Sequence, residues 1–359
     1  MKRWRVAVLG LGHWYSAYGL ARALPGYPHA ELVAAAWHDR EQLEAFTNAF
    51  GVKGYADARE LLAREEVDIV HIAAPVAAIP ELTIAAAQAG KHIVLGKPMA
   101  MTVAQADRMV EAVERAGVMC LPFQCIMRLR MGDVKRRVEA GTIGDVLVMH
   151  QTSRWSIAED SYRSGKPGWF VDPAQVPGGA FIDEGIYWVD FFQWMAGSDV
   201  VQVDAKMANL VHADIAVEDW GMATFTFANG TIATLEAAWT INAPRASGPS
   251  PKHNAVVRLE IVGRGGELHE QWFRSPGRAV LAAGAPDWVY ELQGEERFAP
   301  SAPFPLNHLI DCLEGRATLA GTIHDARRAF VAAMAAYESA RTGQSVRLTP
   351  EGEYARTTR

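Results

Sequence analysis

The sequence predicts an α/β protein that begins with a doubly wound parallel sheet and continues with a second α/β domain on a large, open, mostly antiparallel sheet. Three observations carry this prediction. An apolar run, Val6–Leu9, breaks on Gly10-Leu11-Gly12 and leads into a helical pattern. Short β-type runs then alternate with helical patterns to about residue 122, which is typical of a parallel sheet covered by helices. After residue 123, several β runs follow one another across short turns.

The first domain is expected to span residues 1–122. Its predicted strands are the apolar runs Arg5–Leu9, Leu32–Trp37, Ile69–Ala73, His92–Leu95 and Met119–Phe123. Its predicted helices have apolar residues at helical spacing and span Tyr15–Leu24, Arg40–Phe50, Ala58–Arg64, Ile79–Ala89 and Val103–Ala116. Because ligands of such sheets bind beyond the carboxyl ends of the strands, the loops at that edge are the candidate site.

The second domain is expected to span residues 123–359. Its predicted helices are Met131–Ala140, which Gly141 stops, Phe181–Met195 and the alanine-rich Asp325–Thr342. The predicted strands are Val146–Ser153, Val200–Asn209, Asp219–Phe227, Thr231–Trp239 and Val256–Val262, with more β structure after Gly266. The proline-rich stretch Pro244–Lys252 predicts a mobile loop between strands.

Composition limits the classes of protein that the chain can be. At 359 residues, two domains are the default. The residues are 50% hydrophobic and 21% charged, and the formal net charge of −6 argues against nucleic acid or an anionic membrane as the main partner. No apolar stretch has the length of a membrane span. We therefore expect a small-molecule partner.

The cysteines and the N-terminus indicate the compartment. Cys120, Cys125 and Cys312 form no C-x-x-C pair and have no histidine nearby at metal spacing, so they predict neither a disulfide framework nor a metal site. The basic residues at the start precede an apolar run, Val6–Leu11, that is short for a signal peptide. We expect a cytoplasmic protein.

The glycine turn after the first strand has features of a dinucleotide-binding turn. The first glycine permits a tight turn, the second lets the backbone approach a pyrophosphate, and the following helix presents free N–H groups. The third position of the G-x-G-x-x-G/A pattern is Tyr15, so an ordinary strand-to-helix turn is the alternative. The residues expected to hold a cofactor here are Gly10, Leu11, Gly12, His13 and Trp14.

Two further loops are expected at the same edge of the sheet. Ala74 and Pro75 follow one predicted strand and Lys97-Pro98 follows the next, which makes Ala74, Pro75 and Lys97 candidates for cofactor contact. Taken alone, a lysine before proline is a solvated residue held in an extended conformation. Its place beyond a cofactor-type strand favours a role for Lys97 in the site.

In the second domain, Pro177-Gly178-Gly179 leads into a helical segment that carries Asp183 and Tyr187 one turn apart on the same face. Gly185 between them is expected to leave room for a ring or a ligand. The alternative is that Asp183 is a first-turn carboxylate favoured by the helix dipole and Tyr187 a core aromatic with a bonded hydroxyl.

Three segments, Arg5–Gly12, Ala87–Ala100 and Gly178–Gly185, together resemble the Gfo/Idh/MocA oxidoreductases, named for glucose-fructose oxidoreductase and inositol dehydrogenase. The most specific part is Ala-Gly-Lys-His before Lys-Pro-Met-Ala, and the resemblance covers nearly the whole chain. It implies a Rossmann nucleotide-binding domain, then an α/β domain whose open sheet carries the substrate face and usually the dimer contact. It therefore also implies a homodimer or homotetramer and NAD- or NADP-dependent chemistry on a secondary alcohol of a sugar, polyol, inositol or related cyclic compound.

The resemblance also implies roles for three residues. Lys97 matches the lysine of the family's Glu-Lys-Pro, Asp183 matches the aspartate of its Asp-x-Gly-x-His, and Tyr187 stands at the histidine. Lys97 would then polarise the substrate oxygen, Tyr187 would act as acid/base, and Asp183 would orient the substrate hydroxyl or the lysine. A tyrosine, with an ordinary pKa of about 10, is a poor base near neutrality unless a cation such as Lys97 stabilises its phenolate.

Some positions depart from the family pattern. Gly96 stands where the family usually has glutamate, which removes a carboxylate beside Lys97, and Val76 and Ile79 replace the usual Asn and His. Two other functions therefore stay open. One is a redox-neutral enzyme with tightly bound NAD that cleaves or epimerises a sugar through a transient keto intermediate. The other is a non-catalytic cofactor-binding protein, which retention of Lys97, Asp183 and Tyr187 argues against.

The expected cofactor is NADP or NAD, with NADP favoured. Trp37 stands where a ribose-binding acid is usual, and His38 and Arg40 nearby could accept a 2'-phosphate. The alternative is that these two are surface residues and that Asp39 binds the ribose.

Candidate substrate contacts come mainly from the polar, aromatic loop before Gly178. Trp155, Trp169 and Phe170 could stack on a sugar ring, although tryptophans could equally hold the loop in place. Hydrogen bonds to the substrate are expected from Gln124, Arg154 and Asp172.

Overall fold

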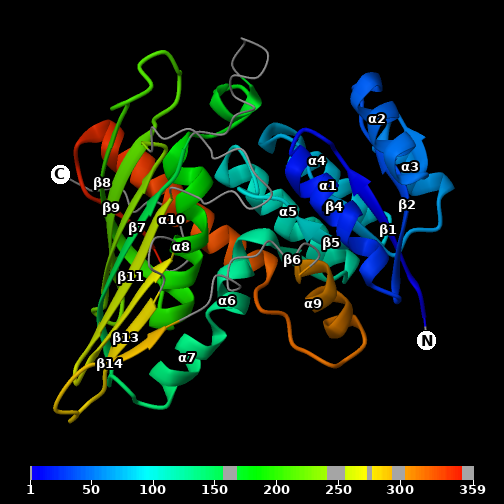
Figure 1. The fold of residues 1–359 in the computed structure, drawn as a ribbon. Helices are drawn as coiled ribbons and strands as arrows, with labels where there is room; N and C mark the ends of the chain where they lie inside the picture. The colour runs from blue at the N-terminus through cyan, green and yellow to red at the C-terminus, as the bar shows by residue number, and fades with distance from the viewer. Residues whose placement is uncertain (1, 157–167, 241–254, 273–276, 293–303, 350–359) are drawn as a thin grey trace. The chain divides into compact units, whose positions relative to one another are not determined.

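A computed structural model gives the fold and describes residues 2–156, 168–240, 255–272, 277–292 and 304–349 (Figure 1). The chain folds as two compact units. The first contains residues 1–126, 174–177 and 300–327, and the second contains residues 127–173, 178–299 and 328–359. Each unit is built on a sheet of its own.

The first unit contains a six-stranded parallel sheet in the order β3-β2-β1-β4-β5-β6. Its strands are β1 (Trp4–Leu9), β2 (Ala30–Ala36), β3 (Lys53–Tyr55), β4 (Ile69–Ile72), β5 (His92–Leu95) and β6 (Cys120–Pro122). Its helices include α1 (Trp14–Ala23), α2 (Arg40–Phe50), α3 (Ala58–Arg64), α4 (Ile79–Gln88), α5 (Val103–Ala116) and α9 (Phe304–Leu313). Every residue of β4 is buried, as expected for a parallel sheet with both faces covered.

The strand order of this sheet defines where a ligand would bind. β1 pairs with β2 on one side and with β4 on the other, so the chain direction across the sheet reverses at β1. The loops after β1 and β4 therefore meet at the topological switch point, where doubly wound sheets bind their ligands.

The second unit contains a nine-stranded sheet in the order β14-β13-β12-β11-β7-β10-β9-β8-β15. Its strands are β7 (Val146–Arg154), β8 (Val200–Ala208), β9 (Trp220–Phe227), β10 (Ile232–Ala238), β11 (Val256–Gly263), β12 (Glu267–Trp272), β13 (Gly277–Leu281), β14 (Val289–Leu292) and β15 (Val346–Arg347). Within this sheet β10 and β7 run parallel, and the other neighbouring pairs run antiparallel. The predicted mostly antiparallel sheet is confirmed.

Alternating burial shows which face of this sheet is covered. In β10, Ala233, Leu235 and Ala237 are fully buried beneath α8 (Ala180–Ala196), whereas Ile232 is 40% exposed on the other face. The remaining helices of the second unit are α6 (Ile126–Arg130), α7 (Gly132–Glu139) and α10 (Ile323–Thr342), which begins in the first unit. We call the face opposite α8 the open face.

The predicted helices and the named predicted strands are present, with bounds that differ by at most a few residues. Arg40–Phe50, Ala58–Arg64, His92–Leu95 and Val103–Ala116 have the predicted bounds. The elements β3, α6, α9 and β15 were not predicted. The expected loop Pro244–Lys252 lies outside the described residues. Among the helices of the described residues, none is long and apolar enough to cross a membrane.

Candidate active site

The glycine turn after β1 packs directly on the end of β4. A Cβ atom added to Gly10, which has φ +90°, would lie 2.5 Å from the Ala74 Cβ, and one added to Gly12 would lie 2.5 Å from the Pro75 Cδ. The backbone N–H of His13 donates to the Ala73 carbonyl at 3.0 Å. Both glycines are therefore required for this close approach, and the predicted cofactor residues of the two loops lie together at the switch point.

The first turn of α1 has the properties of an anion-binding helix start. His13 is its N-cap residue but makes no side-chain cap, and there is no acidic residue in the turn. The positive end of the helix dipole is therefore not offset by a carboxylate in the first turn. The Leu11 side chain is buried in the apolar core, so only its backbone is available to a ligand.

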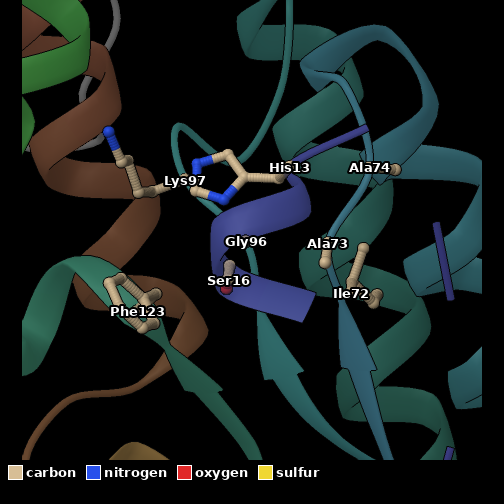
Figure 2. Close-up of a pocket in the computed structure, with 8 residues that line it drawn as sticks. All are labelled: His13, Ser16, Ile72, Ala73, Ala74, Gly96, Lys97 and Phe123. Atoms are coloured by element: carbon tan, nitrogen blue, oxygen red, sulfur yellow. The ribbon is translucent and has the colours of Figure 1, made fainter. Parts of the chain in front are cut away.

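A small pocket beside this turn contains Lys97. Figure 2 shows the Lys97 side chain running next to the His13 ring. The pocket is lined by His13, Ser16, Ile72, Ala73, Ala74, Gly96, Lys97 and Phe123. Lys97 is only 6% exposed, so its charge is largely withdrawn from water. A cation held in this way acts more strongly on a neighbouring charge than a solvated one.

Two histidines near Lys97 are neutral at pH 7. Burial, then Lys97 and then His71 hold the pKa of His13 well below its ordinary value. Burial lowers the pKa of His71 to about 4, and Ser16 Oγ lies at hydrogen-bond distance, 2.8 Å, from its Nε2. The hydroxyl of Tyr15 lies 2.8 Å from His13 Nε2. Lys97 thus faces a neutral imidazole at the Gly10–Gly12 turn.

Gly96, the residue before Lys97, lies close to the end of β4 and to Ile79 of α4. A Cβ on Gly96 would lie 2.8 Å from the Ile72 carbonyl oxygen and 3.1 Å from Ile79 Cδ1. Ile79 is 1% exposed and fills this space. The two departures from the family pattern, Gly96 and Ile79, are therefore neighbours in space.

The segment expected to meet the ribose, residues 37–40, forms the entry to α2. The Asp39 carboxylate caps the helix by accepting from the Gln42 N–H at 3.0 Å, and Trp37 donates its ring N–H to the Gln42 side chain at 3.0 Å. The His38 ring lies 4.1 Å from the Trp37 ring. Arg40 is highly exposed and pairs with Glu44 at 2.6 Å.

In the second unit, a carboxylate and a phenol hold the start of α8. Glu218 accepts from the N–H groups of Gly179 at 2.9 Å and Phe181 at 3.0 Å, and the Tyr337 hydroxyl donates to it at 2.7 Å. The same hydroxyl accepts from the Ile182 N–H at 3.1 Å. The N-cap residue of α8, Gly179, makes no side-chain cap. Glu218 and Tyr337 accept the hydrogen bonds of the first helix N–H groups in its place.

The glycines before α8 fit against this pair. A Cβ on Gly178 would lie 2.1 Å from the Tyr337 hydroxyl, and one on Gly179 would lie 2.0 Å from the Glu218 carbonyl oxygen. Burial raises the pKa of Glu218, while its hydrogen bonds from Gly179, Tyr337 and Phe181 oppose that rise. Sequence reasoning missed Glu218 and Tyr337, because neither lies near Gly179 along the chain.

The helix so anchored carries Asp183 and Tyr187, both half-buried. Gly185 was expected to leave room for a ring or a ligand, but it faces the sheet. A Cβ added to it would lie 3.1 Å from Leu235 Cδ2 and 3.5 Å from Ala237 Cβ. This glycine lets α8 pack closely on β10. The polar residues Asp183 and Tyr187 are thereby fixed relative to the sheet of the second unit.

The predicted substrate residues lie in different environments. Gln124 is 1% exposed, and its Nε2 makes no hydrogen bond to the described residues. The Trp155 ring N–H donates to Ser153 at 2.9 Å, and Trp169 stacks on Phe170 with ring centroids 3.8 Å apart. Asp172 follows directly on the short helical turn Trp169–Val171.

Arg154 lies at a place that does not suit its predicted role. Its guanidinium binds Glu236 at 2.9 and 2.6 Å, and Glu236 also accepts from the Trp220 ring N–H. Glu236 alternates along β10 with Leu235 and Ala237, which face α8, so this cluster lies on the open face. The sheet lies between Arg154 and the helix that carries Asp183 and Tyr187, so Arg154 is not part of the candidate site.

Within the part of the chain that the structure describes, no three His, Cys, Asp or Glu side chains are grouped so as to hold an ion.

Two protein-family models match the chain. One, described as an oxidoreductase family with an NAD-binding Rossmann fold, matches residues 4–123. The other, described as the GFO/IDH/MocA C-terminal domain, matches residues 131–269. Together they cover well over half of the sequence and bear out the predicted family.

Similar proteins match over nearly the whole length. The scyllo-inositol 2-dehydrogenase (NAD(+)) of Bacillus subtilis (strain 168) is 26% identical over 357 residues, 98% of both chains. The D-apiose dehydrogenase of Paraburkholderia graminis is 28% identical over 97% of this chain and 90% of its own. A solved structure, the WlbA dehydrogenase from Bordetella pertussis in complex with NADH and UDP-GlcNAcA, has a TM-score of 0.79 at 23% identity. It covers 97% of this chain and 98% of its own, and shows the same fold.

Proposed function

The chain belongs to the Gfo/Idh/MocA family of oxidoreductases, and on this premise we propose that it transfers a hydride between a nicotinamide dinucleotide and the secondary alcohol or ketone carbon of a sugar-like substrate. Sugars, polyols, inositols and related cyclic compounds form the substrate class. The observation that carries the proposal is the packing of Gly10 and Gly12 on Ala74 and Pro75, with Lys97 buried in the adjoining pocket. The inositol and apiose dehydrogenases that match over nearly their full length support it.

The first unit fits a dinucleotide. The backbone of Gly10–Trp14, at the start of α1, would bind the pyrophosphate, because the positive end of the helix dipole favours an anion there. Ala74 and Pro75 would form the floor beneath it. The nicotinamide ring, when bound, supplies the hydride acceptor or donor.

Three side chains of the chain are assigned to the reaction. When the alcohol carbon loses its hydride, the hydroxyl proton must leave as well, and we assign its acceptance to Tyr187. Lys97 places a fixed positive charge at the substrate oxygen, where negative charge develops. Asp183 orients the substrate hydroxyl. In the reverse direction Tyr187 returns the proton to the oxygen of the ketone.

We propose NADP as the preferred cofactor. At the end of β2 there is no carboxylate at Trp37 to bind a ribose 2'-hydroxyl, and the Asp39 carboxylate is used as the cap of α2. His38 and the exposed Arg40 supply donors for a 2'-phosphate at the same helix start. Replacing Arg40 by alanine should raise KM for NADP at least tenfold while leaving KM for NAD nearly unchanged. Equal effects on both cofactors would contradict this assignment.

We also propose that the open face forms a contact between two copies of the chain, as a homodimer or within a homotetramer. Met222 on β9 is 44% exposed and Ile232 on β10 is 40% exposed, and both point away from α8. Light scattering of the parent protein should give a mass that is a multiple of the chain mass. A variant that carries both Met222→Glu and Ile232→Glu should give a smaller mass.

We also propose a cytoplasmic location, which the three buried cysteine thiols fit.

The test of the reaction is nicotinamide absorbance at alkaline pH with NAD and NADP over a panel of inositols, aldoses and polyols. We expect turnover with at least one of them, lost in Lys97→Met and in Tyr187→Phe. Lys53→Met, a surface change on β3, is the matched control and should retain activity. Product formation by NMR without net change in absorbance would favour the redox-neutral enzyme instead. Tight cofactor binding with no product from any compound would reject the proposed function.

A further inference from the structure

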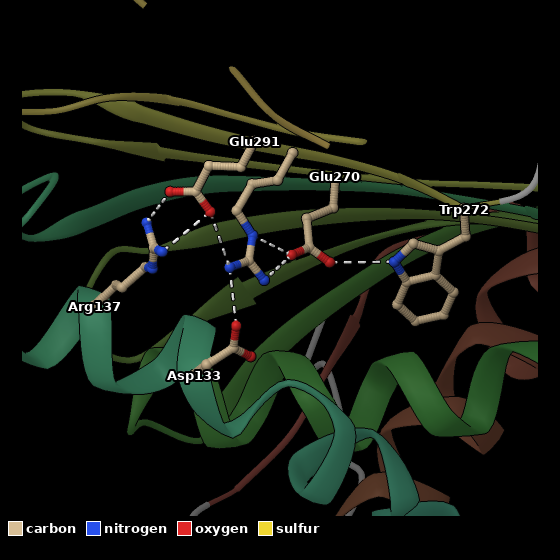
Figure 3. Close-up of polar contacts among 6 residues, drawn as sticks. Asp133, Arg137, Glu270, Trp272 and Glu291 are labelled. Atoms are coloured by element: carbon tan, nitrogen blue, oxygen red, sulfur yellow. Dashed lines mark hydrogen bonds and ion pairs between the residues drawn. The ribbon is translucent and has the colours of Figure 1, made fainter. Parts of the chain in front are cut away.

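A buried polar group normally has partners, and the cluster around Arg278 in the second unit is an example. The Arg278 side chain is 2% exposed and pairs with Asp133 at 2.9 Å, with Glu291 at 3.7 Å and with Glu270. Figure 3 shows these carboxylates converging on one guanidinium, with the Trp272 ring N–H donating to Glu270 at 3.1 Å. Burying a polar group costs free energy unless such partners replace water, so a buried polar atom without a partner requires an explanation.

His71 in the first unit lacks one such partner. It lies on β4 and is 2% exposed, and its Nε2 lies 2.8 Å from Ser16 Oγ. Its Nδ1 is buried and has no hydrogen-bond partner among the described residues. Because the pKa of His71 is about 4, its ring is neutral at pH 7 and carries one proton, either on Nδ1 or on Nε2.

The buried Nδ1 atom decides between these two tautomers. A proton on Nδ1 would leave a buried N–H donor unsatisfied, which is rare in proteins and unfavourable. A proton on Nε2 leaves only a lone pair of Nδ1 without a donor, and buried acceptors tolerate this more often than buried donors do. The Nε2 tautomer is therefore favoured. In this tautomer the ring N–H of His71 donates to Ser16 Oγ.

With its oxygen accepting from His71, the Ser16 hydroxyl keeps its own proton for another acceptor. A hydroxyl in a helix often donates to the carbonyl four residues earlier, as Thr83 of α4 does to Ile79 at 2.8 Å. Ser16 makes no such bond, and within the described residues His71 is the one partner of its hydroxyl. Ser16 lines the pocket that contains Lys97, and Figure 2 shows it on the first turn of α1, below the His13 ring. The pocket is thus the space in which this proton can find an acceptor.

From this geometry we propose that Ser16 is a further cofactor-binding residue, whose hydroxyl donates to a pyrophosphate oxygen of the bound dinucleotide directly or through one water. His71 is the positioning residue that directs this hydroxyl. The inference rests on the proposed function, in which the backbone of Gly10–Trp14 binds the pyrophosphate. Ser16 follows that segment in the first turn of α1.

The size and chemistry of the pocket agree with this assignment. Its volume of about 10 Å³ is close to what one water molecule needs. A water that bridges a protein group and a ligand binds nearly as well as a direct hydrogen bond. A hydrogen bond to an anion is also stronger than one between neutral groups. Losing the Ser16 hydroxyl should therefore weaken dinucleotide binding measurably.

The first test is binding measured by calorimetry, which needs no turnover. The probes are NADH, NADPH and the matching ADP-ribose or 2'-phospho-ADP-ribose, which have the pyrophosphate but lack the nicotinamide. Ser16→Ala should raise Kd about tenfold for dinucleotide and fragment alike, the loss expected for one hydrogen bond to a charged group. The matched control, Thr83→Val, removes a buried hydroxyl that bonds within its own helix and should leave Kd unchanged. Unchanged Kd in Ser16→Ala would overturn the proposal, and so would a loss confined to the probes that contain nicotinamide.

Variants of His71 test its positioning role. His71→Gln keeps an N–H donor near the place of Nε2 and should bind the dinucleotide nearly as well as the parent protein. His71→Leu removes the donor, so the Ser16 hydroxyl can turn away, and Kd should rise severalfold. In the Ser16→Ala background, His71→Leu should raise Kd no further. Losses that multiply in the double variant would overturn the positioning role.

The second test uses the unaltered chain without cofactor. Nitrogen-15 NMR of the histidine rings distinguishes a protonated from an unprotonated nitrogen, and the His71 signals are identified by their absence in His71→Gln. We expect the proton on Nε2 at pH 7. A proton on Nδ1 would overturn the proposal even if Ser16→Ala fails to fold.

The outcomes separate this inference from the proposed function. Normal binding by the parent protein with unchanged Kd in Ser16→Ala rejects the inference alone. Binding that depends on Ser16, with no turnover of any substrate, rejects the proposed hydride transfer and leaves the inference standing. A parent protein that binds neither dinucleotide nor fragment rejects both.

Discussion

Replacing Tyr337 by phenylalanine removes one oxygen atom from the anchor of α8. The hydroxyl donates to Glu218 at 2.7 Å and accepts from the Ile182 N–H at 3.1 Å. The change removes the acceptor of the Ile182 N–H, and Ile182 is only 1% exposed. It also removes one hydrogen-bond donor from the Glu218 carboxylate. A buried unsatisfied donor costs about 1–3 kcal/mol, and a hydrogen bond to a charged group contributes about 1.5–3 kcal/mol. Because both costs come from the loss of one oxygen atom and are not additive, we expect a loss of about 2–4 kcal/mol in the free energy of unfolding.

The loss should depend on pH. Burial raises the pKa of Glu218, and the Tyr337 hydrogen bond opposes that rise, so the variant should have a still higher Glu218 pKa. A folded-state pKa above the unfolded one means that the folded chain binds the proton more tightly, so stability falls as pH rises toward the folded pKa. The gap between variant and parent should therefore be wider at pH 8 than at pH 5.

Denaturant unfolding and calorimetry at both pH values measure this effect. With about 2–4 °C of melting temperature per kcal/mol for a unit of this size, the unit should melt roughly 5–15 °C lower in Tyr337→Phe. Activity should also fall, because Asp183 lies in the turn that loosens. Tyr290→Phe, at a position 76% exposed, is the control and should melt with the parent. A melting temperature within 1 °C of the parent would refute the anchoring role.

Three further predictions concern stability. Gly96→Ala should lower the melting temperature of the first unit by several degrees, because the added Cβ would lie 2.8 Å from a backbone oxygen. The control Gly26→Ala should not lower it, because a Cβ there has no heavy atom within 4 Å. Equal melting temperatures of the two variants would contradict the reasoning. In the folded chain the pKa of His71 is about 4, whereas in the unfolded chain it is about 6.5. Below pH 6.5 the unfolded chain therefore binds a proton at His71 that the folded chain does not bind. The free energy of unfolding should fall by about 3 kcal/mol between neutral pH and pH 4 for this reason. His71→Gln should flatten this dependence in acid titrations, and an unchanged slope would count against it. Arg128→Met should cost about 3–5 kcal/mol, because it removes the guanidinium that pairs with the buried Asp190 carboxylate. Adding Asp190→Leu should recover most of this loss in denaturant unfolding. A double variant as unstable as the single one would argue against the ion pair as the cause.

Local signals were sufficient for several elements. The bounds of α2 follow from Asp39, whose carboxylate caps the helix, and from Gly51, which ends it at φ +66°. The start of α5 is a capping box formed by Thr102 and Gln105, and Gly117 ends it. These residues act within a few positions along the chain, which is why single-sequence reasoning finds such helix ends.

Other elements depend on contacts far apart in the sequence. Helix α9 joins the core of the first unit through Leu306, Leu309 and Ile310, although it follows the second sheet along the chain. The strands β3 and β15 are short edge strands with few apolar residues, so they carry no clear periodicity. Sequence patterns do not report such distant pairings.

The candidate site shows the same division. The glycine turn, Pro75 and Lys97 could be predicted because each follows a recognisable strand. The functions of Gly185 and Glu218 could not, because they depend on which side chain lies opposite: Leu235 for the first and Tyr337 for the second. The space that Ile79 fills beside Gly96 is likewise apparent only in three dimensions.

The most direct measurement of the central claim is the transfer of deuterium in a single turnover. A sugar or inositol that turns over is labelled with deuterium on its secondary alcohol carbons and mixed with excess enzyme and oxidised dinucleotide, and the nicotinamide is examined by NMR. We predict deuterium on C4 of the ring in the parent protein and none in Lys97→Met. Consumption of the substrate with no deuterium on the nicotinamide would contradict hydride transfer as the function of this chain.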